Sequence, residues 1–299
     1  MNKKTIFKGV ATAIITPFNE DGIDYEQFAR LIDWQIESGI NALVVCGTTG
    51  ESSTLTDDEH RDAIAFAAKH VNKRVPVIAG AGSNDTKYAL DLARCSCEAG
   101  ADALLCVTPY YNKATQKGLI EMFTEIADHS TVPIILYNVP SRTGVNIEPS
   151  TYKILADHPN ISGIKEASGN ISKAVETMSL VGDKVDLYSG NDDQILPMLA
   201  LGGKGVISVL SNVLPEKTVK LCDSFFKGNI EECAKLQYEM LPLVHALFSE
   251  VNPIPVKAAM KAMGFCNGKL RLPLTEMEEK GKQILYDEMR KQGIKLTNN

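Results

Sequence analysis

The sequence predicts a (β/α)8 (TIM) barrel, an α/β fold, followed by a helical C-terminal extension. Between residue 9 and about residue 210, short apolar runs alternate with amphipathic stretches, and after about residue 212 only the amphipathic stretches continue. Eight strands that alternate with helices are the number that closes such a barrel, whereas an open doubly wound sheet usually has fewer. We therefore expect the barrel at residues 1–210 and the extension at residues 211–299.

The eight expected strands are short and continuously apolar. A strand that is buried on both faces, as in a parallel sheet, shows no alternation of polar and apolar residues. Each run is followed by Gly, Ser, Thr or Asn, which are residues that favour turns. The strands are expected at residues 10–16, 41–46, 75–80, 101–107, 133–138, 161–166, 185–189 and 205–209.

Helix start signals lie between several of these strands. In a capping box, a small polar side chain accepts a hydrogen bond from the backbone three residues later, where Glu or Gln completes the motif. Proline is tolerated in a first helical turn. The signals are Asp24 with Gln27 (helix to Ser38), Thr56 with Glu59 (helix to His70), Asn84 and Pro149.

The C-terminal extension is expected to contain helices alone. They are predicted over residues 215–227, 230–248, 255–263 and 275–292, with Thr275 and Glu278 as a third capping box. No Ser/Gly-rich linker and no low-complexity segment separates the extension from the barrel. We therefore expect the extension to pack on the barrel rather than to fold independently.

The composition excludes several classes of protein. The net charge of -6 and the lack of a basic stripe argue against nucleic-acid binding. The apolar stretch near the N-terminus ends at Pro17, too early for a signal peptide, and no run approaches the ~20 apolar residues of a membrane span. We therefore expect a soluble cytoplasmic protein that binds neither nucleic acid nor membrane.

The cysteines and histidines predict neither disulfides nor a metal site. The seven cysteines are odd in number and form no CxxC pair, which is typical of free thiols in a reducing compartment. The five histidines are scattered, without an HExxH motif or a Cys/His cluster. No metal site of recognisable spacing is therefore expected.

The residues suited to chemistry lie at the ends of the expected strands. Reactive groups of a (β/α)8 barrel lie on that face, which the βα loops build. They are Thr48 and Thr49 after the second strand, Tyr110 and Tyr111 after the fourth, Tyr137 in the fifth, Arg142 in the loop beyond it and Lys165 in the sixth.

Lys165 is the strongest of these candidates. It lies in ISGIKEASG, where its neighbours are apolar or small. Burial of its ammonium would lower the pKa from about 10.4 and supply the neutral amine that must attack a carbonyl. The alternative is a lysine at a strand end whose ammonium lies in solvent, which is the usual situation of an arbitrary lysine.

The other candidates each have a functional and a structural interpretation. Tyr137 in LYNVP suits either a proton carrier for imine formation or a core aromatic with a bonded hydroxyl. Thr48 and Thr49, which are bracketed by glycines, suit either a tight turn or a site for a small carboxylate. Arg142 in SRTG is either a solvated charge or a bidentate partner of a substrate carboxylate.

Five motifs occur in a characteristic order, and together they identify a resemblance. They are GTTGES, TPYYN, YNVPSRTG, GIKEASG and SGNDD, and the resemblance covers about residues 7–290. The chain resembles the 4-hydroxy-tetrahydrodipicolinate synthase (dihydrodipicolinate synthase) family of the N-acetylneuraminate lyase-like pyruvate aldolases. The resemblance implies a class I (Schiff-base) lyase that condenses pyruvate with L-aspartate 4-semialdehyde in lysine and diaminopimelate biosynthesis. The imine itself would be the electron sink, so neither a metal nor an organic cofactor is implied.

The resemblance also implies a catalytic group of residues. Lys165 would form the imine with pyruvate. Tyr137, Thr49 and Tyr111 would relay protons, with Tyr111 reaching in from a neighbouring subunit. The family usually forms a homotetramer, a dimer of tight dimers, so the dimer would be the smallest active unit.

Further residues are implied in substrate binding. Thr48 and Thr49 would hold a carboxylate, and Arg142 would bind the carboxylate of aspartate semialdehyde. Gly190 and the carbonyl of Ile207 would line the pyruvate pocket.

Many members of this family carry an allosteric lysine site. The corresponding positions here are Ser52, Ser53, His60, Asn84 and Tyr110. Two positions depart from the inhibited pattern, because Asp57 stands where a histidine is common and Tyr88 stands where a glutamate often meets the lysine amine. The loss of that glutamate removes a charge partner and argues against feedback inhibition, and His60 equally suits a solvent-exposed position on a helix.

Two other functions remain as alternatives. A sister aldolase, such as N-acetylneuraminate lyase or a keto-deoxy sugar-acid aldolase, shares the lysine and the tyrosine, but Arg142 suits a short acidic aldehyde better than a polyhydroxylated sugar. A non-catalytic barrel that binds a keto acid is the remote alternative, because a fold by itself does not determine a function. That alternative predicts loss of Lys165 or Tyr137, and the chain has both.

Overall fold

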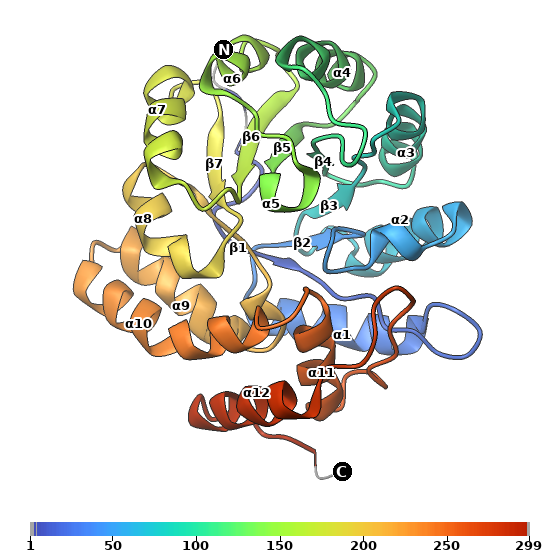
Figure 1. The fold of residues 1–299 in the computed structure, drawn as a ribbon, viewed down its shortest axis with the longest axis vertical. Coiled ribbons are helices and arrows are strands. Elements are labelled where there is room, and N and C mark those ends of the chain that lie inside the picture. Colours follow the sequence, from blue (N-terminus) through green and yellow to red (C-terminus); the bar gives the residue numbers. More distant parts are fainter. Residues whose placement is uncertain (1–2, 4, 298–299) are drawn as a thin grey trace.

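A closed barrel of eight parallel strands forms the centre of the molecule (Figure 1). The computed structural model describes residue 3 and residues 5–297. Each strand pairs with the next along the chain, and β8 pairs with β1. The predicted barrel and all eight predicted strands are therefore confirmed. The strands are β1 (Gly9–Ala13), β2 (Ala42–Val45), β3 (Val77–Gly80), β4 (Ala103–Val107), β5 (Ile134–Asn138), β6 (Ile161–Glu166), β7 (Asp186–Ser189) and β8 (Gly205–Ser208).

Helices surround this barrel and also form the C-terminal part of the chain (Figure 1). Those between the strands are α1 (Tyr25–Glu37), η1 (Ser52–Thr54), α2 (Asp57–Val71), α3 (Thr86–Glu98), α4 (Gln116–Asp128), α5 (Pro140–Thr143), α6 (Pro149–Leu155), α7 (Ile171–Val181), η2 (Asp192–Gln194) and α8 (Ile195–Ala200). Those after β8 are η3 (Leu210–Asn212), α9 (Pro215–Phe226), α10 (Ile230–Leu247), α11 (Ile254–Ala262) and α12 (Glu279–Lys291).

Three of the predicted helix starts are confirmed. Asp24 accepts a hydrogen bond from the backbone N–H of Gln27 at the start of α1. Thr56 and Glu59 form both hydrogen bonds of a capping box at the start of α2. Pro149 occupies the first turn of α6.

Two other predicted starts are wrong. The cap of α3 is Asp85, whose carboxylate accepts from the backbone N–H of Lys87, while the Asn84 side chain donates to the Tyr110 carbonyl at 3.2 Å. The last helix starts at Glu279 rather than at Thr275. Before it, the Met277 side chain is buried and the backbone N–H of Glu278 donates to Glu250, which holds this segment outside the helix.

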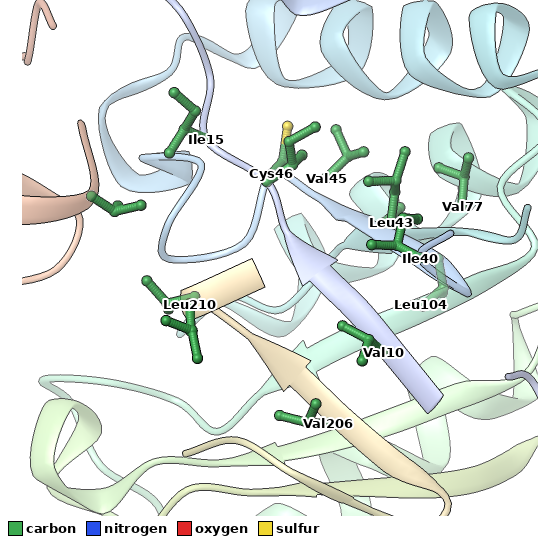
Figure 2. Packing of buried hydrophobic residues seen from close by; sticks show 14 of the residues in the cluster. Val10, Ile15, Ile40, Leu43, Val45, Cys46, Val77, Leu104, Val206 and Leu210 are labelled. Carbon is green, nitrogen blue, oxygen red and sulfur yellow. The ribbon is translucent and has the colours of Figure 1, made fainter. Parts of the chain in front are cut away.

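The barrel strands have two buried faces. Side chains at alternate positions point outward into the layer between strands and helices, where Val10 of β1 and Val206 of β8 lie on neighbouring strands (Figure 2). Residues in between point into the barrel, among them Ala11, Val44 and Ile78. This double burial explains why the strand sequences are continuously apolar.

Aromatic side chains fill the barrel interior toward the N-terminal ends of the strands. Phe7, just before β1, stacks on Tyr188 of β7 with ring centroids 4.3 Å apart. The Tyr188 hydroxyl donates to the Phe7 carbonyl at 2.9 Å. Both residues are buried, so the space for a ligand lies toward the C-terminal ends of the strands.

The C-terminal helices continue the packing of the barrel helices. α9 packs against β1, α10 packs against α8 and α9, and α11 and α12 pack together on α10. They lie along one side of the barrel, orange to red in Figure 1. The boundary at residue 210 remains a prediction.

Two further properties concern the described residues. All seven cysteines are free thiols. Within the part of the chain that the structure describes, no helix has both the length and the apolar character needed to span a membrane.

Candidate active site

Lys165 points into the barrel from β6. Its strand neighbour Ile164 belongs to the outward-facing cluster, and side chains alternate along a strand. Lys165 is in register with Tyr137 of β5 and with Tyr188 of β7. The residue is only 6% exposed, and its Nζ lies 4.1 Å from the centroid of the Tyr137 ring. The alternative in which this ammonium lies in solvent is therefore wrong.

This position changes the protonation of Lys165. Burial lowers its pKa from 10.5 to about 7, the nearby carboxylate of Asp192 opposes this change, and the positive charge of Arg142 adds to it. Burial acts in this direction because the charged ammonium loses its hydration. Near neutral pH, a large share of the Lys165 amines is thus unprotonated and able to attack a carbonyl carbon.

Tyr137 is the phenol that lies against this lysine. It is buried, which raises its pKa, while the charge of Arg142 and the nearby Thr48 hydroxyl act in the opposite direction. The threonine whose hydroxyl lies close enough to Tyr137 to affect its pKa is thus Thr48, whereas the sequence predicts Thr49 for the proton relay. Both threonines follow β2 and lie in the same turn.

Thr49 is bonded to a residue that the sequence did not indicate. The Asn252 side-chain Nδ2 donates to Thr49 Oγ1 at 3.0 Å. The carbonyl of Asn252 accepts from Arg142 Nη2 at 3.1 Å. Asn252 precedes α11, and it is separated from Thr49 by 203 positions, so no local pattern could have revealed the contact.

A buried ion pair fixes the end of the same loop. Lys257 Nζ of α11 lies 2.6 Å from Glu51 Oε1, and both side chains are completely buried. Glu51 has φ 55°, in the left-handed region that is uncommon for residues other than glycine. The turn before α11 therefore holds the loop after β2 at Thr49, and α11 holds it at Glu51.

Asp192 is a second functional candidate that the sequence analysis missed. Its Oδ2 accepts from the backbone N–H groups of Val209 at 3.0 Å and Leu210 at 2.9 Å, and the residue is buried. Burial raises its pKa, and the neighbouring Lys165 lowers it. The motif SGNDD contains this residue, and only its place in the fold distinguishes it from Asp193.

Gly190 and Ile207 lie at the ends of neighbouring strands. The N–H of Gly190 donates to the Glu166 carbonyl at 2.7 Å, and a Cβ on this glycine would lie 2.6 Å from the Cβ of Ala167. No other residue therefore fits so close to the end of β6. Ile207 is buried and belongs to the cluster inside the barrel.

Thr48 and Arg142 line a cavity of about 460 Å³ at this end of the barrel. Four of the candidate allosteric residues line the same cavity, whereas Asn84 meets it through its hydrogen bond to the Tyr110 carbonyl. The four are Ser52, Ser53, His60 and Tyr110.

His60 does not lie in solvent, so that expectation is wrong. It is buried, and its Nε2 lies 2.8 Å from the Gly80 carbonyl. Burial lowers the pKa of this imidazole. The side chain faces the barrel because α2 turns this position toward β3.

Tyr111 is the most exposed of the candidate residues. Its side chain is 91% exposed, and its backbone has φ 68°. Tyr110 beside it is 38% exposed. Within this one chain, Tyr111 thus projects away from the barrel rather than toward Lys165.

No group of three His, Cys, Asp or Glu side chains suited to a metal ion occurs among the described residues. The polar groups around Lys165 are a phenol, hydroxyls, a guanidinium and a carboxylate. Such a set is suited to binding carboxylates and transferring protons around a reactive amine.

Comparisons with known proteins give a consistent picture. Residues 6–292 match the model of the dihydrodipicolinate synthetase family. The chain is 53% identical to a 4-hydroxy-tetrahydrodipicolinate synthase of Acetivibrio thermocellus, over 98% of this chain and 99% of the relative. It is 54% identical to the protein of that name from Caldicellulosiruptor bescii, over 98% and 99% of the two chains. The crystal structure of dihydrodipicolinate synthase from Aquifex aeolicus superposes with a TM-score of 0.96 at 43% identity, over 98% of this chain and 100% of that one.

Proposed function

Because this chain belongs to the dihydrodipicolinate synthetase family, we propose that it condenses pyruvate with L-aspartate 4-semialdehyde through an imine on Lys165. The relatives carry the name 4-hydroxy-tetrahydrodipicolinate synthase, and the chain is accordingly a lyase of lysine and diaminopimelate biosynthesis. Their names support this function over a sugar-acid aldolase and over a non-catalytic barrel. The observation that carries the mechanism is the buried Lys165 amine against Tyr137.

The reaction depends on the lowered pKa of Lys165, which leaves its amine neutral in many molecules near pH 7. Its neutral amine attacks the carbonyl carbon of pyruvate, and the resulting carbinolamine loses water to give a protonated imine. Loss of a proton from the methyl carbon gives an enamine, whose carbon attacks the aldehyde of the second substrate. The amino group of that substrate then displaces Lys165, which closes a six-membered ring and frees the lysine.

Protons for these steps pass through the phenol of Tyr137. Its ring lies against Lys165, and the Thr48 hydroxyl lies close enough to the phenol to lower its pKa, which supports Thr48 as the next member of the relay. A hydroxyl is both a donor and an acceptor, so it can pass a proton on. The predicted third member, Tyr111, is exposed in one chain, which supports its donation to the site of a second copy.

The carboxylates of the substrates are assigned to Thr49 and Arg142. Arg142 lies close enough to the site to affect the pKa values of Lys165 and Tyr137. Its planar guanidinium can bind a carboxylate bidentately, which supports its role toward aspartate semialdehyde. The position of Thr49 in the loop after β2 supports a role in binding the pyruvate carboxylate. Gly190 and Ile207 are assigned to the wall of that pocket.

The assembly and the location of the protein belong to the same proposal. A site that takes Tyr111 from a second copy requires a dimer, and we propose a tetramer made of two such dimers. The free cysteines support function in the reducing cytoplasm.

Borohydride trapping tests this function directly. The protein is incubated with pyruvate, reduced with borohydride, digested and analysed by mass spectrometry. We expect a reduced pyruvate adduct on Lys165 that is absent without pyruvate. An unmodified Lys165 in a folded, oligomeric sample would contradict the imine mechanism.

Lys257 is the control within the same molecule. It is also buried, and burial lowers its pKa. Its Nζ is held by Glu51 and by the Lys269 carbonyl at 2.7 Å, so it should remain unmodified. Modification of Lys257 as well would mean that pyruvate and borohydride modify buried amines in general rather than the amine of one pyruvate site.

A further inference from the structure

Asn252 connects the two residues assigned to the substrate carboxylates. Its side-chain Nδ2 donates to Thr49 Oγ1, and its backbone carbonyl accepts from Arg142. The residue is 6% exposed, and its Oδ1 is buried without a hydrogen-bond partner among the described residues. A buried amide with an unpaired oxygen destabilises a fold. Stability alone therefore does not account for an asparagine at this position.

The direction of the hydrogen bond to Thr49 decides what the threonine can do. A hydroxyl offers one proton and two acceptor lone pairs. Because Nδ2 is a donor, it takes up an acceptor site of Oγ1 and leaves the Thr49 proton to be donated elsewhere. A carboxylate accepts hydrogen bonds only, so a threonine that binds it must present its proton.

The loop that carries Thr49 is held in place by the same part of the chain. The buried pair of Glu51 and Lys257 fixes the loop two residues further on. Lys257 belongs to α11, which begins two residues after Asn252. The distance between Asn252 and Thr49 is thus set by a rigid connection rather than by one hydrogen bond.

We propose that Asn252 is a positioning residue that sets the affinity for pyruvate by orienting the Thr49 hydroxyl toward the pyruvate carboxylate. This inference rests on the proposed function, because it needs pyruvate in the barrel. It makes the C-terminal segment before α11 a part of the substrate site. Asn252 acts through Thr49 and takes no part in the bond-forming steps.

The first test compares two variants. Asn252→Ala removes the donor and frees the Thr49 hydroxyl to rotate, and Asn252→Asp replaces it by an acceptor that attracts the Thr49 proton and repels a carboxylate. We expect the pyruvate concentration for half-maximal adduct on Lys165 to rise about tenfold in the alanine variant and further in the aspartate variant. The kcat at saturating pyruvate should change less than about twofold, since an effect on bound pyruvate alone leaves the later steps intact.

Two readouts separate positioning from general damage to the structure. Both variants keep the backbone carbonyl that Arg142 contacts, so the KM for aspartate semialdehyde should stay unchanged. Asn160→Asp is the control, because Asn160 is a half-buried asparagine whose Nδ2 also donates hydrogen bonds, to two carbonyls at the opposite end of β6. It should lower the melting temperature without a change in the half-saturation by pyruvate.

A double-mutant cycle tests whether Asn252 acts through Thr49. Thr49→Val removes the hydroxyl and keeps the shape of the side chain. In this background, Asn252→Ala should leave the pyruvate half-saturation unchanged, because residues that act on one group are not additive. Should the aspartate variant not fold, the alanine variants complete the cycle.

Two results would overturn the proposal. One is an alanine variant with the same pyruvate half-saturation as the unchanged protein, and the other is an equal effect of Asn252→Ala with and without the Thr49 hydroxyl. A failure of the proposed function looks different, because the unchanged protein would then form no adduct on Lys165 at any pyruvate concentration.

Discussion

Lowering the pH below 7 is expected to slow imine formation at Lys165 about tenfold for each pH unit. Only the neutral amine is nucleophilic, and burial places the pKa of this lysine at about 7. A lysine that kept the pKa of 10.5 would be neutral in roughly one molecule in three thousand at pH 7. Lys165 is neutral in about half of the molecules, which makes it on the order of a thousandfold more available for attack.

Two substitutions should move this pH dependence in opposite directions. Asp192→Asn removes the negative charge that favours the ammonium, so the midpoint should fall to lower pH. The amide oxygen can still accept from the N–H groups of Val209 and Leu210. Arg142→Met removes a positive charge that disfavours the ammonium, so the midpoint should rise.

Rapid mixing with pyruvate measures these midpoints without the second substrate. The protein is mixed with pyruvate between about pH 5.5 and pH 9 and reduced with borohydride after set intervals, and the adduct is counted by intact mass. A midpoint near the ordinary lysine value would refute the argument from burial. Shifts of both variants in one direction would refute the assignment of the two neighbouring charges.

Four further predictions follow from the same structure. The lowered pKa of Lys165 means that the unfolded chain binds more protons between pH 7 and pH 10.5. Burial of the Lys165 ammonium therefore lowers the free energy of unfolding most below pH 7, and this loss disappears as the pH rises to 10.5. Lys165→Met should accordingly stabilise the protein at pH 6 by at most roughly 5 kcal/mol, measured by urea unfolding. Arg142→Ala should raise the KM for aspartate semialdehyde about tenfold or more and leave the final extent of pyruvate trapping at pH 9 intact. Lys257→Met should lower the free energy of unfolding by about 3–5 kcal/mol, because it removes the ion-pair partner of a buried carboxylate. L-Lysine should not inhibit initial rates, because Asp57, the carboxylate that lines the cavity of the candidate allosteric residues, is exposed and already accepts from the Tyr88 hydroxyl at 2.8 Å.

Each of these predictions has a result that contradicts it. The stability prediction for Lys165 fails if Lys165→Met leaves the stability at pH 6 unchanged, and the prediction for Lys257 fails if Lys257→Met is as stable as the unchanged protein. The role of Arg142 is contradicted by loss of pyruvate trapping in Arg142→Ala. The last prediction is contradicted by inhibition that rises with lysine concentration. Lys184→Met, at a half-exposed ion pair on the surface, is the control for the stability measurements, because such pairs contribute about 1 kcal/mol or less.

The strands could be predicted from the sequence because burial on both faces leaves a continuous apolar run. The ends of the strands are harder to predict, because a residue can be buried without forming the hydrogen bonds of a strand. The first run was expected to reach residue 16, but β1 ends at Ala13. Ile14 and Ile15 remain buried, and the N–H of Ile15 donates to the Asn212 side chain instead of to a strand.

The helix caps show a different limit. Asp24 and Thr56 were identified because a capping motif involves residues three positions apart. Asn84 and Asp85 are both acceptable caps, and the choice between them follows from a distant contact, the hydrogen bond of Asn84 to Tyr110. A sequence pattern contains no information about such a contact.

The same distinction applies to the candidate site. Lys165, Tyr137 and Thr48 were found because the ends of barrel strands converge, a rule that needs only the order of the strands. Asn252 and Asp192 were missed because they reach the site through long-range contacts. Asn252 lies far from any strand end, and Asp192, although it follows β7 closely, is distinguished from Asp193 only by its place in the fold.

The loop after β2 shows why the barrel and the extension act together at the site. A boundary at residue 210 would separate Glu51 from Lys257 and Thr49 from Asn252, although each pair lies within hydrogen-bonding distance. Without Lys257, the carboxylate of Glu51 would be buried without its ion-pair partner and would keep only the backbone N–H of Arg271, a state that costs several kcal/mol. The loop would then rearrange to reach water, and Thr49 would move with it. The geometry of the site therefore depends on both parts of the chain, wherever the boundary between them is drawn.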